Sequence, residues 1–310
     1  MNKLIKFFTR RRSTFSPLTR GGTGRGLLSS LNGETSQPPR PPASTKLGTG
    51  LSGGRRIAVS SATFLMLGMA GIAQADEISV AVAANFTEPM KKIAAEFEKT
   101  SGHKVALSFG STGKFYSQIK AGAPFEVLVA ADDETPLKLE QEGAAVKGSH
   151  FTYAIGKLVL WSAKEAVVDD KGEVLKKSGF DHLALANPKL APYGAAGIET
   201  LKSLGAYDAV APKIVQAENI AQTYQFVATG NALIGFVALS QVIGEDGKVK
   251  SGSVWIVPEK LYTQIRQDAV LLQNGASGGK DKAAAQALLK FLKSPFASKV
   301  IASYGYGQDK

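Results

Sequence analysis

The stretch EISVAVAANFTEPMKKIAAEFEKTSG, residues 77–102, contains the pattern that decides the fold. Its first eight residues form a short apolar run, which is typical of a buried parallel strand. Pro89 then falls in the first turn of a helical pattern that ends at Gly102. The apolar side chains of that pattern recur at helical spacing: Met90, Ile93, Ala94 and Phe97. The sequence therefore predicts a strand that runs directly into an amphipathic helix.

The same alternation of strand and helix patterns continues to the end of the chain. Further strands are predicted at residues 104–109, 125–131, 183–187, 213–217, 232–239, 254–258 and 269–275. This alternation predicts an α/β architecture with parallel sheets and right-handed crossovers. Ligands bind such sheets at the carboxyl ends of the strands, so a site is expected in the loops that follow strands.

The first 75 residues differ in composition from the rest. Residues 1–54 are rich in Ser, Gly, Pro and Arg without apolar periodicity, which predicts a disordered leader. Residues 55–75 combine Arg55 and Arg56 with an apolar block and a small-x-small ending, which predicts a signal peptide cleaved after Ala75. The alternatives are a membrane anchor and an organellar transit segment. Export to the periplasm is the expectation.

Charge is unevenly distributed along the chain. The formal net charge is +11, but residues 1–75 hold eleven of the 37 basic and one of the 26 acidic residues. The rest therefore holds 26 basic and 25 acidic residues, with Arg266 as its single arginine. A nearly neutral body excludes a basic groove for nucleic acid. Cysteine is absent, which excludes disulfides and cysteine-ligated metals.

The stretch FGSTGK, residues 109–114, resembles the end of a phosphate-binding loop. A P-loop requires glycine where this chain has Ser108, and a hydroxyl residue where it has Phe115. The absent hydroxyl removes a Mg²⁺ ligand, which argues against nucleotide hydrolysis. A strand followed by Gly-Ser-Thr-Gly and a helix still offers unpaired N–H groups and hydroxyls to an anion. An ordinary capped turn is the alternative for this loop taken alone.

Three other loops repeat that arrangement of a strand, a polar turn and a helix. They contain AANFTE (83–88), APYGAAG (191–197) and AENIAQ (217–222). None of the four loops contains arginine, and only one contains a lysine. The four together predict an anion held by neutral donors at helix N-termini.

Catalytic patterns are weak by comparison. The three histidines do not pair with one another or with carboxylates at metal-binding spacing: His103, His150 and His182. Asp132, Asp133 and Glu134 could bind a cation, but an acidic first helical turn explains them. Ser111 has no partner histidine that sequence can identify. No catalytic residue and no cation site is therefore predicted.

From residue 76 onward the chain resembles the periplasmic molybdate-binding proteins of ABC transporters. The stretches that carry the resemblance are ISVAVAANFTEPMKKIAAEFEKTSGHKV, SFGSTGKFYSQIKAGAPFEVLVAADDETPLKLEQEG, ANPKLAPYGAAGIETLKSLGAYD and AENIAQTYQFVATGNALIGFVALSQV. The resemblance implies the two-lobed α/β fold of type II periplasmic binding proteins, with the ligand in the cleft between the lobes. The lobes are expected to comprise residues 76–156 with 262–310, and residues 157–261.

The resemblance also implies the ligand contacts. The family holds a tetrahedral oxyanion with hydroxyls or amides and main-chain N–H groups from four loops. Matching the motifs places these contacts on Asn85 with Ala84 beside it, Thr112 with Ser111 beside it, Tyr193, and the main-chain N–H of Ile220. No cofactor is implied, because molybdenum is bound as its oxyanion.

Because these loops offer neutral hydrogen-bond donors, they restrict the class of anion that the site would bind. Molybdate, tungstate and sulfate are fully deprotonated near neutral pH, whereas phosphate keeps a proton that would require an acceptor. The acids in the four loops, Glu88 and Glu218, fall at expected helix starts. The choice of molybdate among the dianions comes from the resemblance alone.

The resemblance implies a monomeric, non-enzymatic protein that binds molybdate, and also tungstate, and delivers it to the permease of an ABC transporter. Three alternatives stay open at this point. They are a binding protein for another oxyanion such as sulfate, an enzyme on the same scaffold, and a P-loop NTPase.

Overall fold

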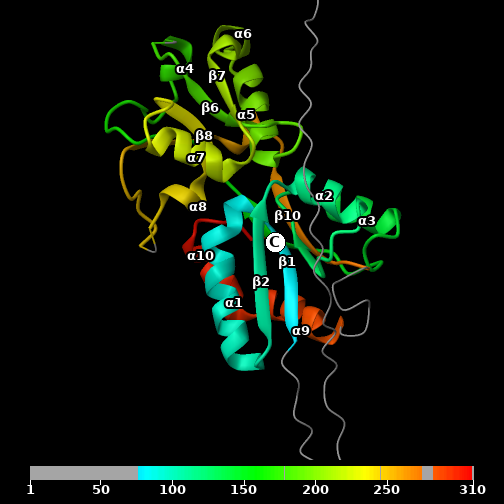
Figure 1. The fold of residues 1–310 in the computed structure, drawn as a ribbon. Helices are drawn as coiled ribbons and strands as arrows, with labels where there is room; N and C mark the ends of the chain where they lie inside the picture. Colours follow the sequence, from blue (N-terminus) through cyan, green and yellow to red (C-terminus); the bar gives the residue numbers. More distant parts are fainter. Residues whose placement is uncertain (1–75, 178, 245, 274–281, 309–310) are drawn as a thin grey trace, which may run out of the picture. The chain divides into compact units, whose positions relative to one another are not determined.

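The computed structural model of the protein describes residues 76–308, except 178, 245 and 274–281. The described residues belong to one compact unit and form two five-stranded sheets with helices on their faces (Figure 1). The predicted leader, signal peptide and cleavage site lie outside the described residues. Within the described part, no helix is long and apolar enough to cross a bilayer.

The first sheet has the strand order β2-β1-β3-β10-β4. Its strands are β1 (Glu77–Ala83), β2 (Lys104–Gly110), β3 (Val127–Val129), β4 (Phe151–Gly156) and β10 (Ile265–Leu271). The helices of this lobe are η1 (Ala84–Phe86), α1 (Thr87–Ser101), α2 (Thr112–Lys120), α3 (Glu134–Gln141), α9 (Lys282–Leu292) and α10 (Pro295–Ser303). We refer to this sheet and its helices as lobe 1.

The second sheet has the order β7-β6-β8-β5-β9. Its strands are β5 (Leu158–Ser162), β6 (Leu183–Ala186), β7 (Ile214–Ala217), β8 (Ile234–Ala238) and β9 (Ser253–Ile256). Its helices are α4 (Val174–Lys177), α5 (Pro192–Ser203), α6 (Tyr207–Val210), η2 (Ala211–Lys213), α7 (Ile220–Ala228), α8 (Leu239–Val242) and η3 (Glu259–Leu261). We refer to this sheet and its helices as lobe 2.

Each sheet is buried on both faces. In lobe 1, α1, α9 and α10 cover one face, and α2 and α3 cover the other through Phe115 and Leu139. In lobe 2, Leu201 of α5 packs on one face and Val227 of α7 on the other. The four apolar residues of α1 that set the helical pattern are all buried, and Gly102 ends that helix with a positive φ of 78°. The predicted two-lobed α/β fold is confirmed.

The expectation of parallel sheets is only partly correct. β1 pairs in parallel with β2 and β3, and β6 pairs in parallel with β7 and β8. β10 and β5 are antiparallel to their neighbours. They are the strands next to the crossings between the sheets, with β4 ending at Gly156 and β5 beginning at Leu158. A chain that enters from the other lobe needs no helical crossover, so it can pair antiparallel.

Candidate functional site

The helices that follow β1, β2, β6 and β7 begin around one small cavity. Its lining residues are Ala83, Ala84, Asn85, Gly110, Ser111, Thr112, Ala131, Ala191, Pro192, Tyr193 and Ile220. All six residues that the sequence assigned to a ligand are among them. The cavity has a volume of about 10 Å³, which is room for about one water molecule.

The start of α2 provides the clearest unsatisfied donor. Ser111 is the N-cap residue of α2, yet its side chain makes no cap hydrogen bond. Its hydroxyl oxygen is buried without a hydrogen-bond partner among the described residues. Buried polar groups are nearly always paired, so an unpaired hydroxyl at an uncapped helix start indicates a place for a ligand.

Thr112 begins α2 and is also buried, with 1% of its surface exposed. Its Oγ1 accepts a hydrogen bond from the main-chain N–H of Ala131 at 2.9 Å. Because that bond uses only the oxygen, the hydroxyl hydrogen stays available to an acceptor in the cavity.

Asn85 lies in η1, directly after β1, and is 3% exposed. Its amide nitrogen donates to Oε1 of Gln267 at 3.0 Å and to the hydroxyl of Tyr306 at 3.1 Å. Both amide hydrogens are therefore used within the protein. The main-chain N–H at the start of this short helix is the donor that Asn85 can offer, since the first N–H groups of a helix have no partner inside it.

Tyr193 is held against the cavity by the start of α5. Pro192 occupies the first turn, where its missing N–H costs nothing. Gly194 allows the helix to approach β6 closely, because a side chain there would collide with the carbonyl oxygen of Ala186. Burial raises the pKa of the Tyr193 phenol well above its ordinary value, and Tyr306 adds to the shift. The hydroxyl therefore keeps its hydrogen at neutral pH.

Ile220 begins α7 after the N-cap residue Asn219. The Asn219 side chain accepts hydrogen bonds from the main-chain N–H groups of Ala221 and Gln222, both at 3.0 Å. This cap does not take the N–H of Ile220, which lines the cavity. The identity of the Ile220 side chain is unimportant for such a main-chain contact.

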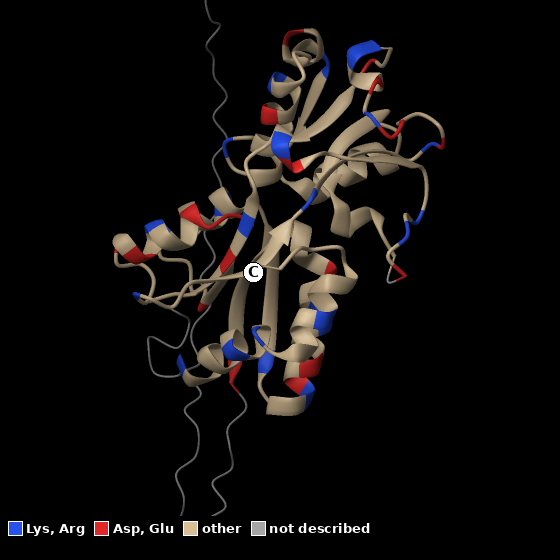
Figure 2. Ribbon diagram, turned by 180° about the vertical axis from the view of Figure 1, so that it is seen from behind, with Lys and Arg blue, Asp and Glu red and all other residues tan. Residues whose placement is uncertain are grey.

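No charged side chain from the described part of the chain lines the cavity. Lys114, from the P-loop-like stretch, instead forms an ion pair with Glu218, which joins α2 of lobe 1 to the loop before α7 of lobe 2. Figure 2 shows Lys and Arg interspersed with Asp and Glu along the ribbons of both lobes. Among the described residues, no group of three His, Asp or Glu side chains could hold a metal ion.

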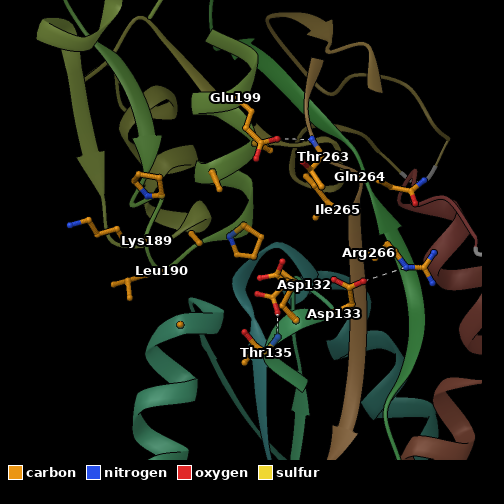
Figure 3. A pocket seen from close by; sticks show the side chains of 18 residues that line it. Asp132, Asp133, Thr135, Lys189, Leu190, Glu199, Thr263, Gln264, Ile265 and Arg266 are labelled. Carbon is orange, nitrogen blue, oxygen red and sulfur yellow. Dashed lines mark hydrogen bonds and ion pairs between the residues drawn. The ribbon is translucent and has the colours of Figure 1, made fainter. Parts of the chain in front are cut away.

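A larger pocket of about 310 Å³ adjoins the cavity and shares Ala131, Ala191 and Pro192 with it. Figure 3 shows Asp132 and Asp133 from lobe 1 facing Glu199 from lobe 2 across this pocket. Asp132 accepts a hydrogen bond from the Thr135 N–H at 2.8 Å, and Arg266 pairs with Asp133 at 3.5 Å. Burial raises the pKa of Asp132 to about 6, and the neighbouring acids add to this.

Sequence reasoning missed the side chains that hold the cavity residues in place. These are Tyr153, Ser240, Gln267 and Tyr306, all buried. They come from distant parts of the chain, and none was predicted to have a role, although Ser240 and Tyr306 lie in stretches that resemble the family, ALSQV and YGYG. The available signal was weak, because Gln267 lies between the charged residues Arg266 and Asp268 in β10.

The chain is similar to known proteins over most of the residues that the structure describes. The family described as bacterial extracellular solute-binding protein matches residues 78–307. The molybdate-binding protein ModA of Azotobacter vinelandii is 62% identical over 239 residues, covering 77% of this chain and 93% of that protein. The molybdate-binding protein ModA of Rhodobacter capsulatus is 55% identical over 247 residues, covering 80% of this chain and 94% of that protein.

A solved structure gives the same result. The periplasmic molybdate-binding protein of Azotobacter vinelandii superposes with a TM-score of 0.72 at 42% identity, covering 75% of this chain and 100% of that chain. The sulfate-binding protein SubI of Mycobacterium tuberculosis matches with a TM-score of 0.58 at 14% identity, covering 74% of this chain and 86% of that chain. The second likeness shows a shared fold alone.

Proposed function

The chain belongs to the molybdate-binding proteins within the bacterial extracellular solute-binding family, and from this premise we propose that it binds molybdate in the cavity between its lobes. It presents the anion to the permease of an ABC transporter. The proposed contacts are Ala84, Asn85, Ser111, Thr112, Tyr193 and Ile220. Asn85 and Ile220 contribute main-chain N–H groups, and Ser111, Thr112 and Tyr193 contribute hydroxyls.

One observation supports this proposal above the others. The buried Ser111 hydroxyl has no partner in the described protein, although it stands at an uncapped helix start. The lining residues that the structure describes offer donors and no carboxylate. A fully deprotonated dianion accepts hydrogen bonds from every side, so this lining suits molybdate, tungstate or sulfate better than hydrogen phosphate. The relatives favour molybdate among these dianions.

Binding requires a hinge motion. The cavity has room for about one water molecule, and a tetrahedral metal oxyanion is larger. The lobes therefore part for entry and close again on the anion, which stabilises the closed state because both lobes contribute donors. The bodies that move are residues 76–156 with 262–310, and residues 157–261. We further propose that the protein acts in the periplasm as a monomer, after cleavage behind Ala75, and has no catalytic activity.

A thermal-shift titration tests the ligand. With molybdate at about 100 times its dissociation constant, the unfolding temperature should rise by roughly 5–10 °C, and tungstate should act similarly. Sulfate and phosphate at the same concentration should produce a smaller shift. A shift with sulfate but none with molybdate would reassign the ligand, and no shift with any oxyanion would favour an unrelated solute or an enzyme.

The pH dependence of binding should report on Asp132. Its carboxyl has a pKa raised to about 6, and the other charged side chains of the pocket are Asp133, Glu134, Lys189, Glu199 and Arg266. Ionisation of Asp132 above pH 6 places a negative charge beside the anion, so a bound dianion favours its protonated form. Molybdate affinity should therefore fall roughly 3- to 10-fold between pH 5.5 and 7.5.

The Asp132→Asn variant serves as the comparison for that pH profile. It should bind with an affinity that changes much less over the same range, because amide and protonated carboxyl groups are both uncharged. Titration calorimetry at both pH values measures the difference. Identical pH profiles for the variant and the parent protein would show that Asp132 does not influence the anion.

A further inference from the structure

Gln267 lies on β10 and is fully buried, with 0% of its surface exposed. Its Nε2 donates a hydrogen bond to the Tyr193 hydroxyl oxygen at 3.0 Å. Its Oε1 accepts from Asn85 Nδ2 at 3.0 Å and lies 2.9 Å from the Tyr153 hydroxyl. Asn85 and Tyr193 line the cavity, whereas Gln267 stands behind them. One amide therefore joins a cavity residue of lobe 1 to a cavity residue of lobe 2.

The backbone is shaped to place this amide. The pairing of β10 with β4 is irregular between Gln267 and Asp268, where Tyr153 of β4 is skipped in the register as at a β-bulge. Bulges turn side chains out of the regular alternation and occur next to functional sites. Gly156, at the end of β4, provides the space. A β-carbon there would lie 2.5 Å from Gln267 Nε2 and would collide with the Tyr193 hydroxyl.

The bond from Gln267 determines what the Tyr193 hydroxyl can do. A phenolic hydroxyl has a single hydrogen, and the Tyr193 oxygen already accepts a hydrogen bond from Gln267. No described residue accepts the Tyr193 hydrogen. A buried donor without an acceptor is unfavourable, so this hydrogen calls for an acceptor that enters the cavity.

We propose that Gln267 is a positioning residue that commits the Tyr193 oxygen as an acceptor and so directs its only hydrogen toward the bound anion. This inference rests on the proposed function of the cavity. A reversed Gln267 amide would instead accept the Tyr193 hydrogen and withdraw it from the anion. The contact of Gln267 Oε1 with Asn85 Nδ2, which is itself held by Tyr306, fixes the orientation.

The same arrangement distinguishes between oxyanions that differ in protonation state. An anion that carries a hydroxyl, such as hydrogen phosphate, must donate its own hydrogen to some acceptor. Gln267 already occupies the acceptor side of Tyr193, and the cavity lining offers no carboxylate. Gln267 thus removes the Tyr193 oxygen as an acceptor for such a hydrogen without touching the anion.

A double-mutant cycle measured by titration calorimetry with molybdate tests this role. Tyr193→Phe removes the hydroxyl and should weaken binding at least tenfold in the parent protein. In the Gln267→Glu background, the carboxylate accepts the Tyr193 hydrogen and withdraws it from the anion. Tyr193→Phe should then weaken molybdate binding by less than about twofold. Both members of that second pair carry Glu at position 267, so their difference isolates the Tyr193 hydroxyl in that background.

Tyr262→Phe is the matched control, because it removes another buried hydroxyl, one that accepts from the Leu158 N–H at 3.3 Å outside this cluster. The Tyr262→Phe variant should bind molybdate with the same affinity as the parent protein. If Tyr193→Phe costs the same in both backgrounds, or costs nothing in the parent, the positioning role is refuted. If Gln267→Glu does not fold, an unchanged affinity in Tyr193→Phe alone still refutes the role. Absence of molybdate binding by the parent protein would instead refute the proposed function.

Discussion

Replacing Ser111 by alanine should weaken molybdate binding by roughly 10- to 150-fold, because it removes a donor to a buried dianion. The Ser111 hydroxyl is buried and has no partner in the described protein. The substitution therefore breaks no internal hydrogen bond, and the ligand-free protein should unfold at the same temperature or slightly higher. Titration calorimetry and thermal unfolding without ligand measure the two effects separately.

Ser108→Ala is the matched control for that substitution. Ser108 lies on β2, three residues before Ser111, and is exposed. It should change neither affinity nor stability. An unchanged affinity in Ser111→Ala would show that the anion does not contact α2, and a loss of stability would show that this hydroxyl has an internal role.

Gly113→Ala should weaken binding roughly tenfold or more by hindering closure of the lobes. The Gly113 N–H donates to the Leu190 carbonyl oxygen of lobe 2 at 2.9 Å. A β-carbon on Gly113 would lie 2.9 Å from Leu190 Cα, which is too close for backbone that cannot rotate away. The ligand-free protein can relieve this clash by opening, so its unfolding temperature should hardly change.

Small-angle scattering measures the closure directly. The parent protein should become more compact with molybdate, and Gly113→Ala should do so less at saturating ligand. Gly179→Ala is the control, since a β-carbon there meets no atom within 4 Å and the residue has an ordinary φ. If Gly113→Ala closes and binds like the parent, contact between Gly113 and Leu190 does not limit closure.

Local pattern was sufficient to predict most elements of the fold. The apolar run at 77–84 and the helical spacing after it correspond to β1, η1 and α1. The four loops could be predicted because each combines a strand end with a helix start in one short stretch. The direction of β10 and β5 could not, because it depends on where the chain crosses between lobes rather than on the residues of either strand.

The side chains behind the cavity show most clearly what the sequence could not predict. Asn85 was expected to offer a ligand donor, and its sequence context is consistent with that. Its two amide hydrogens are nevertheless used by Gln267 and Tyr306, which are 182 and 221 residues away along the chain. Such partnerships follow from the closing of the tertiary structure, and no periodicity or spacing in one sequence encodes them.

We propose that one molybdate ion lies among the four helix starts. Diffraction from crystals of the protein grown with molybdate, recorded at the molybdenum absorption edge, tests it most directly. We expect one strong anomalous peak, with anion oxygens within hydrogen-bond distance of the Ser111, Thr112 and Tyr193 hydroxyls and of the Ile220 N–H. An empty cavity, or a peak elsewhere on the protein, would contradict it.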